Sequence, residues 1–273
     1  MRIKVSNTFV RILVSVLAIP LILGVCFWGK FLFLGFTLVI GGVAYYEFIA
    51  FAKQKDAAGS LLIGLPAVLL IIVNAYFKFI DFTSLAFGVV FLFLLHELFR
   101  NKKSAIINLG ITFLGVFYIG LFVSSLISVR EYFVDYQKGA FVIISMLATI
   151  WICDSAAYFF GLSFGKHRLF LRVSPKKSWE GAVAGFVFSI ISMLAAKLLV
   201  VEFLSWQDVI IIGVILGTVG QVGDLIESLL KRDAGVKDSS NIIPGHGGIF
   251  DRFDSLIYST PVVFLYIKYF ISQ

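Results

Sequence analysis

Nine apolar runs, each close to the length that crosses a bilayer, constrain this chain more than any other feature. A membrane-spanning helix needs about 20 mostly apolar residues to cross a hydrocarbon layer of about 30 Å. Because 60% of the residues are hydrophobic and 14% are charged, one soluble core could not enclose the apolar surface. We therefore expect an all-α, polytopic membrane protein with about nine transmembrane helices. The runs lie near residues 12–28, 31–52, 61–80, 84–99, 105–128, 139–162, 181–201, 208–230 and 254–271.

The positive charges predict how these spans are oriented. With nine spans, the N-terminus and the loops near 53–60, 100–104, 163–180 and 231–253 lie on one side. Most of the 23 Lys and Arg residues are on this side, which the positive-inside rule assigns to the cytoplasm. We expect a multi-pass protein of a bacterial inner membrane, with its polar loops in the cytoplasm. The net charge of +7 fits anionic headgroups and a polyphosphate substrate, although a positive-inside excess alone gives the same sign.

The distribution of polar residues predicts two halves. Residues 1–130 are expected to form a membrane scaffold of about five helices with few polar residues at membrane depth, and residues 131–273 a catalytic half of about four helices. Glu47, near the end of the second apolar run, is either interfacial or functional. Cys26 and Cys153 both lie inside expected spans, so we expect buried thiols and no disulfide.

Acidic side chains enter the later spans, where an unpaired carboxylate is costly. Asp154 and Tyr158 are four residues apart and share a helix face, although Asp154 could also be interfacial. In the eighth run, Asp224, Ser228 and Lys231 form a polar stripe on an otherwise apolar helix. Carboxylates at this depth are functional candidates.

Three glycines of the eighth run, Gly213, Gly217 and Gly220, would let a neighbouring helix approach closely. A packing interface explains these glycines, and they leave room for a homodimer. They do not explain the carboxylate that follows them.

Two acids at the start of the last run complete a candidate metal site. Asp251 and Asp254 are three residues apart, so a helix starting near Asp251 would place both on one face. Together with Asp224 they could bind Mg²⁺, which prefers carboxylate and phosphate oxygens. The alternative is that Arg232 or Arg252 simply neutralises these acids.

The polar stretch 228–254 reads SLLKRDAGVKDSSNIIPGHGGIFDRFD and mixes charges of both signs with glycines. It resembles the signature of the phosphatidate cytidylyltransferases, also called CDP-diacylglycerol synthases. The matching positions are Ser228, Lys231, Arg232, Lys237, Asp238, Pro244, His246, Gly247, Gly248, Asp251, Arg252 and Asp254. Two further elements of this family are matched by Asp154, Ser155, Ala157 and Tyr158, and by Ser174, Pro175, Lys176, Lys177, Ser178, Glu180 and Gly181.

The resemblance implies transfer of the cytidylyl group of CTP to phosphatidate, with Mg²⁺ as cofactor. The implied partners are CTP, phosphatidate and the lipid bilayer, with no nucleic acid. The expected catalytic residues are Asp224, Lys231, Asp238, His246, Asp251 and Asp254. The expected substrate-binding residues are Lys176, Lys177, Ser228, Arg232, Lys237 and Arg252. The expected metal ligands are Asp224, Asp251, Asp254 and, more weakly, Asp154.

Two other functions remain open from the residues alone. A CTP-dependent polyisoprenol kinase would use a similar membrane site but would release CDP instead of pyrophosphate. An ion-coupled transporter would also place acids within spans. The sequence disfavours transport, because the polar residues gather toward one face and no inverted repeat is visible.

Overall fold

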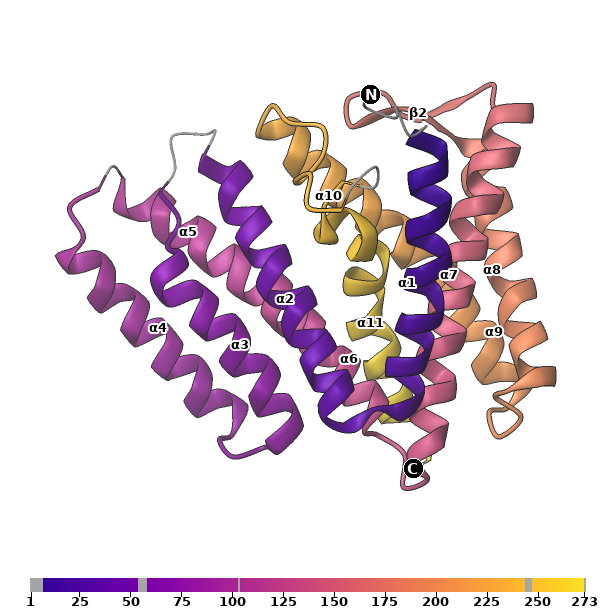
Figure 1. Cartoon of the computed structure of the whole chain (residues 1–273), viewed down its shortest axis with the longest axis horizontal. Coiled ribbons are helices and arrows are strands. Elements are labelled where there is room, and N and C mark those ends of the chain that lie inside the picture. Colours follow the sequence, from indigo (N-terminus) through magenta and orange to yellow (C-terminus); the bar gives the residue numbers. More distant parts are fainter. Residues whose placement is uncertain (1–6, 54–57, 103, 244–246, 273) are drawn as a thin grey trace, which may run out of the picture. The chain divides into compact units, whose positions relative to one another are not determined.

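The computed structural model describes residues 7–53, 58–102, 104–243 and 247–272, with only the backbone described for residues 7–13. Nine continuous helices account for most of this described part, which confirms the all-α prediction (Figure 1). The first five are α1 (Asn7–Trp28), α2 (Lys30–Ala52), α3 (Leu61–Phe77), α4 (Phe82–Phe99) and a helix that joins α5 (Ala105–Gly115), the π-helical η2 (Val116–Leu121) and α6 (Phe122–Arg130). The others are α7 (Tyr136–Phe164), α8 (Trp179–Leu199), a helix that joins α9 (Trp206–Ile215), the π-helical η3 (Leu216–Gly220) and α10 (Gln221–Asp233), and α11 (Ile249–Phe270).

Apolar helices of this length make the chain an integral membrane protein. Among the described residues, six helices are long and apolar enough to cross a membrane. They are Lys30–Ala52, Phe82–Phe99, Ala105–Arg130, Tyr136–Phe164, Trp179–Leu199 and Trp206–Asp233. Val14–Trp28 and Leu61–Phe77 are shorter apolar helices. Each of the nine predicted runs therefore coincides with a helix, while nine as the number of spans stays a prediction.

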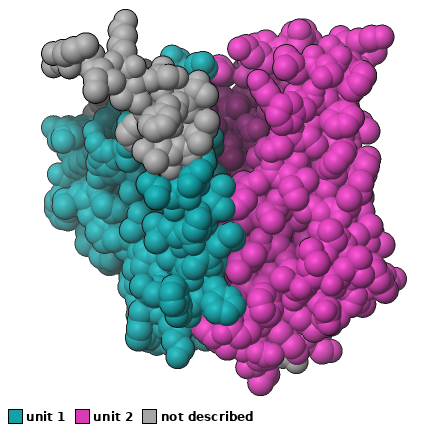
Figure 2. All heavy atoms as spheres, turned by 45° about the vertical axis from the view of Figure 1, so that its right-hand side comes forward, with its two compact units in different colours: residues 1–121, 234–253 teal, residues 122–233, 254–273 magenta. Residues whose placement is uncertain are grey.

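The chain divides into two compact units, which Figure 2 shows in different colours. The first unit contains residues 1–121 and 234–253, and the second contains residues 122–233 and 254–273. This division differs from the predicted halves in two respects. The boundary lies before α6, and most of the signature stretch joins the N-terminal helices.

The first unit packs around α2, which contacts α1, α3, α5 and η2. Tyr45 of α2 is fully buried, and its hydroxyl donates a hydrogen bond to the Ser60 carbonyl over 2.8 Å. A Cβ atom on Gly64 would lie 1.7 Å from that hydroxyl, so only glycine lets α3 approach α2 here. Cys26 of α1 is a buried thiol, as predicted.

The second unit packs α7 along α8, and α8 against α9 and η3. Gly213 and Gly217 face α8, because a Cβ atom on either would lie 3.0–3.1 Å from an α8 Cα atom. The predicted close approach is confirmed, but it occurs within one chain, so these glycines do not support the expected homodimer. Cys153 of α7 is free and buried, as predicted.

The loop between α7 and α8 contains a small antiparallel hairpin that the sequence did not predict. Its strands are β1 (Arg168–Phe170) and β2 (Ser174–Ser178). The Ser178 side chain then caps α8 by accepting a hydrogen bond from the Gly181 amide over 3.2 Å. The hairpin therefore fixes the basic Ser-Pro-Lys-Lys-Ser element to the start of a membrane helix.

Candidate active site

The centre of the candidate site in the second unit is an ion pair between two predicted residues. Lys177 of β2 donates a short hydrogen bond from its ammonium group to Oδ2 of Asp224 in α10. The Ser228 hydroxyl lies 3.4 Å from the other oxygen, Oδ1, one helical turn further along. Both charged side chains are about 30% exposed, so the pair is accessible to a ligand. The hairpin and α10 thus meet at the Asp224 carboxylate, although Lys177 and Asp224 are 47 residues apart in sequence.

Asp254 of α11 lies beside this ion pair. It interacts electrostatically with Asp224 and with Asp154, which carry like charge, and with Lys177, which carries the opposite charge. Gly223 explains how α10 and α11 approach so closely, because a Cβ atom there would lie 2.5 Å from Cβ of Tyr258 and 3.1 Å from the Asp254 carbonyl. The four predicted residues therefore form one cluster, named here the Lys177 cluster: Asp154, Lys177, Asp224 and Asp254.

In the Lys177 cluster, one ammonium group and three acidic side chains lie within electrostatic range of one another. Oxygen ligands grouped in this way suit a hard divalent cation. Within the described residues, no three His, Cys, Asp or Glu side chains are arranged to hold a metal ion by themselves. Magnesium sites commonly use only one or two carboxylates and take their other ligands from water and substrate phosphates. The residues of the cluster fit that kind of incomplete site.

The predicted phosphate-binding cations around this cluster have different environments. Lys176 is exposed on β2, next to the half-buried Lys177. Arg232, at the end of α10, is exposed and has its Nε atom 3.4 Å from the Val173 carbonyl in the turn of the hairpin. Arg232 thereby links α10 to the hairpin. The hairpin presents Lys176 to solvent and Lys177 to Asp224.

Lys231, another predicted catalytic residue, is 8% exposed and forms an ion pair with Glu227 on the same helix. Its Nζ atom lies 2.6 Å from Oε2 of Glu227, four residues earlier. Glu227 lies on α10 beside the polar stripe of Asp224, Ser228 and Lys231. Its position shows that α10 buries one ion pair, while Asp224 on the same helix stays partly exposed.

In the first unit, Asp251 organises the signature loop. Its carboxylate accepts hydrogen bonds from the Gly248 amide over 2.8 Å and from the Ser239 amide over 3.0 Å. The Ser239 hydroxyl lies 3.0 Å from Oδ2 of Asp251, the oxygen that accepts both of these bonds. Because Asp251 is in the first turn of α11, its bond to Gly248 resembles the backward-reaching half of a capping box. Asp251 therefore has a structural role beside the predicted metal role.

Glu47 of α2 is the residue of this region whose importance the sequence did not show. It is 0% exposed and binds the same loop. Oε1 accepts from the Ser240 hydroxyl and from the Ile249 amide over 3.1 Å, and Oε2 accepts from the Ser239 hydroxyl over 3.0 Å and the Phe250 amide over 2.8 Å. One buried carboxylate thus satisfies the first two amides of α11 and two loop hydroxyls.

Packing reinforces these hydrogen bonds at the start of α11. The Phe250 ring stacks on Phe51 of α2 at a centroid distance of 6.4 Å and meets the edge of Tyr118 at 5.9 Å. Gly248 is required by the close approach, since a Cβ atom there would lie 2.6 Å from both Glu47 carboxylate oxygens. The signature loop is therefore anchored on the N-terminal helices, which explains why it belongs to the first unit.

The remaining predicted residues lie on the loop itself. Lys237 and Asp238 are exposed, and so is Arg252 in the first turn of α11. His246, with Pro244 and Gly245, lies outside the described residues. The sequence missed Ser239 and Ser240, which lie inside the signature. A run of two serines is a common turn composition and gave no signal for their role.

Comparison with known proteins identifies the family. A family model described as the cytidylyltransferase family matches residues 9–270. The chain belongs to this family. It is 33% identical over 265 residues to a protein named phosphatidate cytidylyltransferase from Bacillus subtilis (strain 168), covering 95% of this chain and 97% of that protein. Proteins of the same name from Staphylococcus aureus (strain COL) and Staphylococcus saprophyticus are 31% and 30% identical, each covering 93% of this chain and 96% of the relative.

Proposed function

We propose that this chain transfers the cytidylyl group of CTP to phosphatidate, which yields CDP-diacylglycerol and pyrophosphate. Family membership and the names of the relatives support this pair of substrates. The structural observation that carries the proposal is the Lys177–Asp224 ion pair with Asp254 beside it. A partly exposed cluster of both charges on membrane helices suits a reaction between a lipid phosphate and a nucleoside triphosphate.

The proposed reaction asks for little covalent chemistry from the protein. A phosphate oxygen of phosphatidate attacks the α-phosphorus of CTP and forms a new P–O bond. The bond from the α-phosphorus to the oxygen that bridges it to the β-phosphorus breaks, and its electron pair leaves with pyrophosphate. Phosphatidate is already ionised near neutral pH, so no strong general base is needed. Rate then depends on positioning and on compensation of negative charge.

Lys177 is the group best placed to compensate charge. Asp224 holds its ammonium group at the cluster, and about 30% of the Lys177 side chain stays exposed to a ligand. We propose that Lys177 binds a phosphate of CTP, while the exposed Lys176 and Arg232 extend the cationic surface toward the second substrate. Lys231 would act through its pairing with Glu227, as a positioning residue.

We propose Mg²⁺ as the cofactor, held by Asp224 and Asp254. Asp251 and Asp154 remain proposed as further ligands. When bound, Mg²⁺ would neutralise phosphate oxygens and orient the leaving pyrophosphate. The grouping of Asp224, Asp254 and Asp154 supports a divalent ion here, because carboxylate oxygens are ligands that Mg²⁺ prefers.

The proposal is tested by incubating the purified protein with phosphatidate and CTP labelled at the α-phosphate. We expect label in the lipid fraction and one pyrophosphate for each lipid labelled, with activity lost when EDTA removes Mg²⁺. When an acid of the cluster is replaced, as in Asp254→Asn, the matched control is Asp135→Asn. Asp135 is an exposed helix cap, and Asn also caps well. Release of CDP in place of pyrophosphate would instead indicate a kinase and refute the proposal.

We further propose that the site faces the cytoplasm of a bacterium, because most Lys and Arg residues lie on the loops of that side. A cysteine at the exposed position Lys176 reports on this directly, since Cys26 and Cys153 are both buried. We expect a membrane-impermeant maleimide to label Lys176→Cys in inside-out vesicles and not in right-side-out vesicles. The opposite pattern would refute the orientation.

A further inference from the structure

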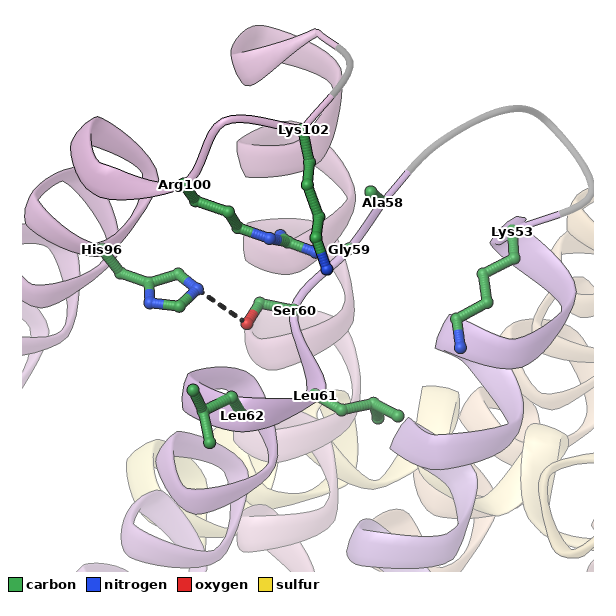
Figure 3. A pocket seen from close by; sticks show the side chains of 9 residues that line it. All are labelled: Lys53, Ala58, Gly59, Ser60, Leu61, Leu62, His96, Arg100 and Lys102. Atoms are coloured by element: carbon green, nitrogen blue, oxygen red, sulfur yellow. Dashed lines mark hydrogen bonds between the residues drawn. The ribbon is translucent and has the colours of Figure 1, made fainter.

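A pocket of about 570 Å³ opens in the first unit, and none of its lining residues was assigned to the candidate active site above. It lies where α2 ends and α3 begins, and where α4 ends and α5 begins. Basic residues dominate its polar lining: Lys53, His96, Arg100 and Lys102. None of the described lining residues is acidic. Figure 3 shows Arg100 and Lys102 pointing toward the segment that contains Gly59 and Ser60, with Lys53 on the far side of that segment.

One of these cations is paired with an acid that does not line the pocket. Glu97 of α4 is 7% exposed and accepts a 2.6 Å hydrogen bond from the Asn108 side chain. Its other oxygen, Oε2, forms an ion pair with Nη1 of the Arg100 guanidinium over 3.4 Å. Lys53 and Lys102 are exposed. The pocket therefore has a cationic lining of which Glu97 offsets only a part.

The N-terminus of α3 adds to the positive potential. Ser60 precedes this helix, but its side chain forms no capping hydrogen bond. The Ser60 hydroxyl instead lies 3.2 Å from Nε2 of His96, on the pocket wall. The first residues of α3, Leu61 and Leu62, also line the pocket. Amides at a helix N-terminus attract anions. Here they lie in a pocket that is also lined by Lys53, Arg100 and Lys102.

The position of these cations along their helices indicates the depth of the pocket in the membrane. Lys53 directly follows the candidate span Lys30–Ala52, and Arg100 directly follows the candidate span Phe82–Phe99. Leu62, in the first turn of α3, is 76% exposed, and Phe99, the last residue of α4, is 80% exposed. Charged groups next to exposed apolar side chains at a span end match the level of phospholipid headgroups.

We propose that this pocket binds the phosphate headgroup of an anionic membrane phospholipid. Arg100 and Lys102 bind the phosphate together with the α3 N-terminus, while Lys53 lines the pocket from the other side of the Gly59–Ser60 segment. The acyl chains follow the exposed side chains of Leu62 and Phe99. This binding does not depend on cytidylyl transfer, since none of its residues belongs to the Lys177 cluster or to the signature.

The test is native mass spectrometry of the full, delipidated chain titrated with phosphatidylglycerol, which lacks the phosphate monoester of phosphatidate, and with phosphatidylcholine as the zwitterionic probe. Each lysine near a headgroup contributes about fivefold to affinity, so Lys53→Ala/Lys102→Ala is expected to weaken phosphatidylglycerol binding by about 25-fold. The exposed positions of both lysines leave the fold intact. Lys138→Ala/Lys268→Ala removes the same charge elsewhere and is expected to bind like wild type.

Two results would overturn the proposal. One is equal phosphatidylglycerol affinity in the pocket variant and in the charge-matched control. The other is displacement of the bound lipid by millimolar inorganic phosphate, which would assign the pocket to a soluble anion. Preference for phosphatidylglycerol over phosphatidylcholine, lost only in the pocket variant and resistant to phosphate, supports the lipid.

Discussion

Replacing Glu47 by Gln tests whether a buried carboxylate on α2 organises the signature loop. The carboxylate accepts four hydrogen bonds, two on each oxygen. Gln keeps one acceptor oxygen and presents an NH₂ group, which only donates, at the position of the other. In either orientation, one of the Ile249 and Phe250 amides loses its acceptor.

The expected loss of stability follows from the hydrogen bonds that Gln cannot accept. A buried amide left unsatisfied costs about 1 to 3 kcal/mol, and the retained bonds weaken by about 1 kcal/mol without the charge. Burying a neutral amide is easier than burying a carboxylate, which offsets part of the loss. We expect about 2 to 3 kcal/mol less stability for the docking of the loop and of the start of α11. This corresponds to an equilibrium constant for local opening that is about 30- to 150-fold larger.

Hydrogen exchange of the Ile249 and Phe250 amides measures this opening directly. We expect exchange to accelerate by the stated factor at these two amides in Glu47→Gln, and cytidylyl transfer to fall with it, because Asp251 shares the Ser239 hydroxyl with Glu47. Glu131→Gln, a half-buried glutamate of the second unit, is the control and should leave both amides unchanged. Exchange at the wild-type rate in Glu47→Gln would refute the reasoning.

Three further substitutions test the site. Gly223→Ala places a Cβ atom 2.5 Å from Tyr258 Cβ, so we expect α10 and α11 to separate and kcat to fall at least about tenfold. Gly220→Ala meets no atom closer than 3.8 Å and should retain activity, and equal kcat in the two variants would argue against the close approach. Lys177→Ala removes the ion-pair cation, and we expect at least about a 100-fold lower kcat for CTP; an unchanged kcat would exclude a direct role. Asp251→Asn should abolish turnover while the chain stays folded in the membrane, and wild-type activity there would remove its metal assignment.

The sequence predicted the helices well because length and apolarity alone determine membrane spans. Each predicted run matches a helix, and two of the three glycines of the eighth run, Gly213 and Gly217, pack closely against α8 as expected. The hairpin between α7 and α8 was missed because its strands, Arg168–Phe170 and Ser174–Ser178, are short, charged and do not alternate. A tight turn in a charged loop leaves no periodic signal.

The candidate site could be predicted only in part, because the sequence shows acids inside apolar runs but does not show their distant partners. Acids inside apolar runs are conspicuous, so Asp224 and Asp254 could be singled out, and the structure brings both to Lys177. Glu47 was left undecided because its partners are about 200 residues further along the chain. Spacing within one helix shows which residues share a face, but it carries no information on what that face meets.

The most direct measurement of the central claim is product formation by Asp254→Asn across a Mg²⁺ titration, with Asp135→Asn measured alongside it. The claim is that Asp224, Asp254 and Lys177 form a metal-assisted site for cytidylyl transfer. Wild type and Asp135→Asn are predicted to give CDP-diacylglycerol and pyrophosphate in equal amounts, with saturation in Mg²⁺. Asp254→Asn is predicted to lose at least about 100-fold in rate at every Mg²⁺ concentration. Wild-type turnover by Asp254→Asn would contradict the account.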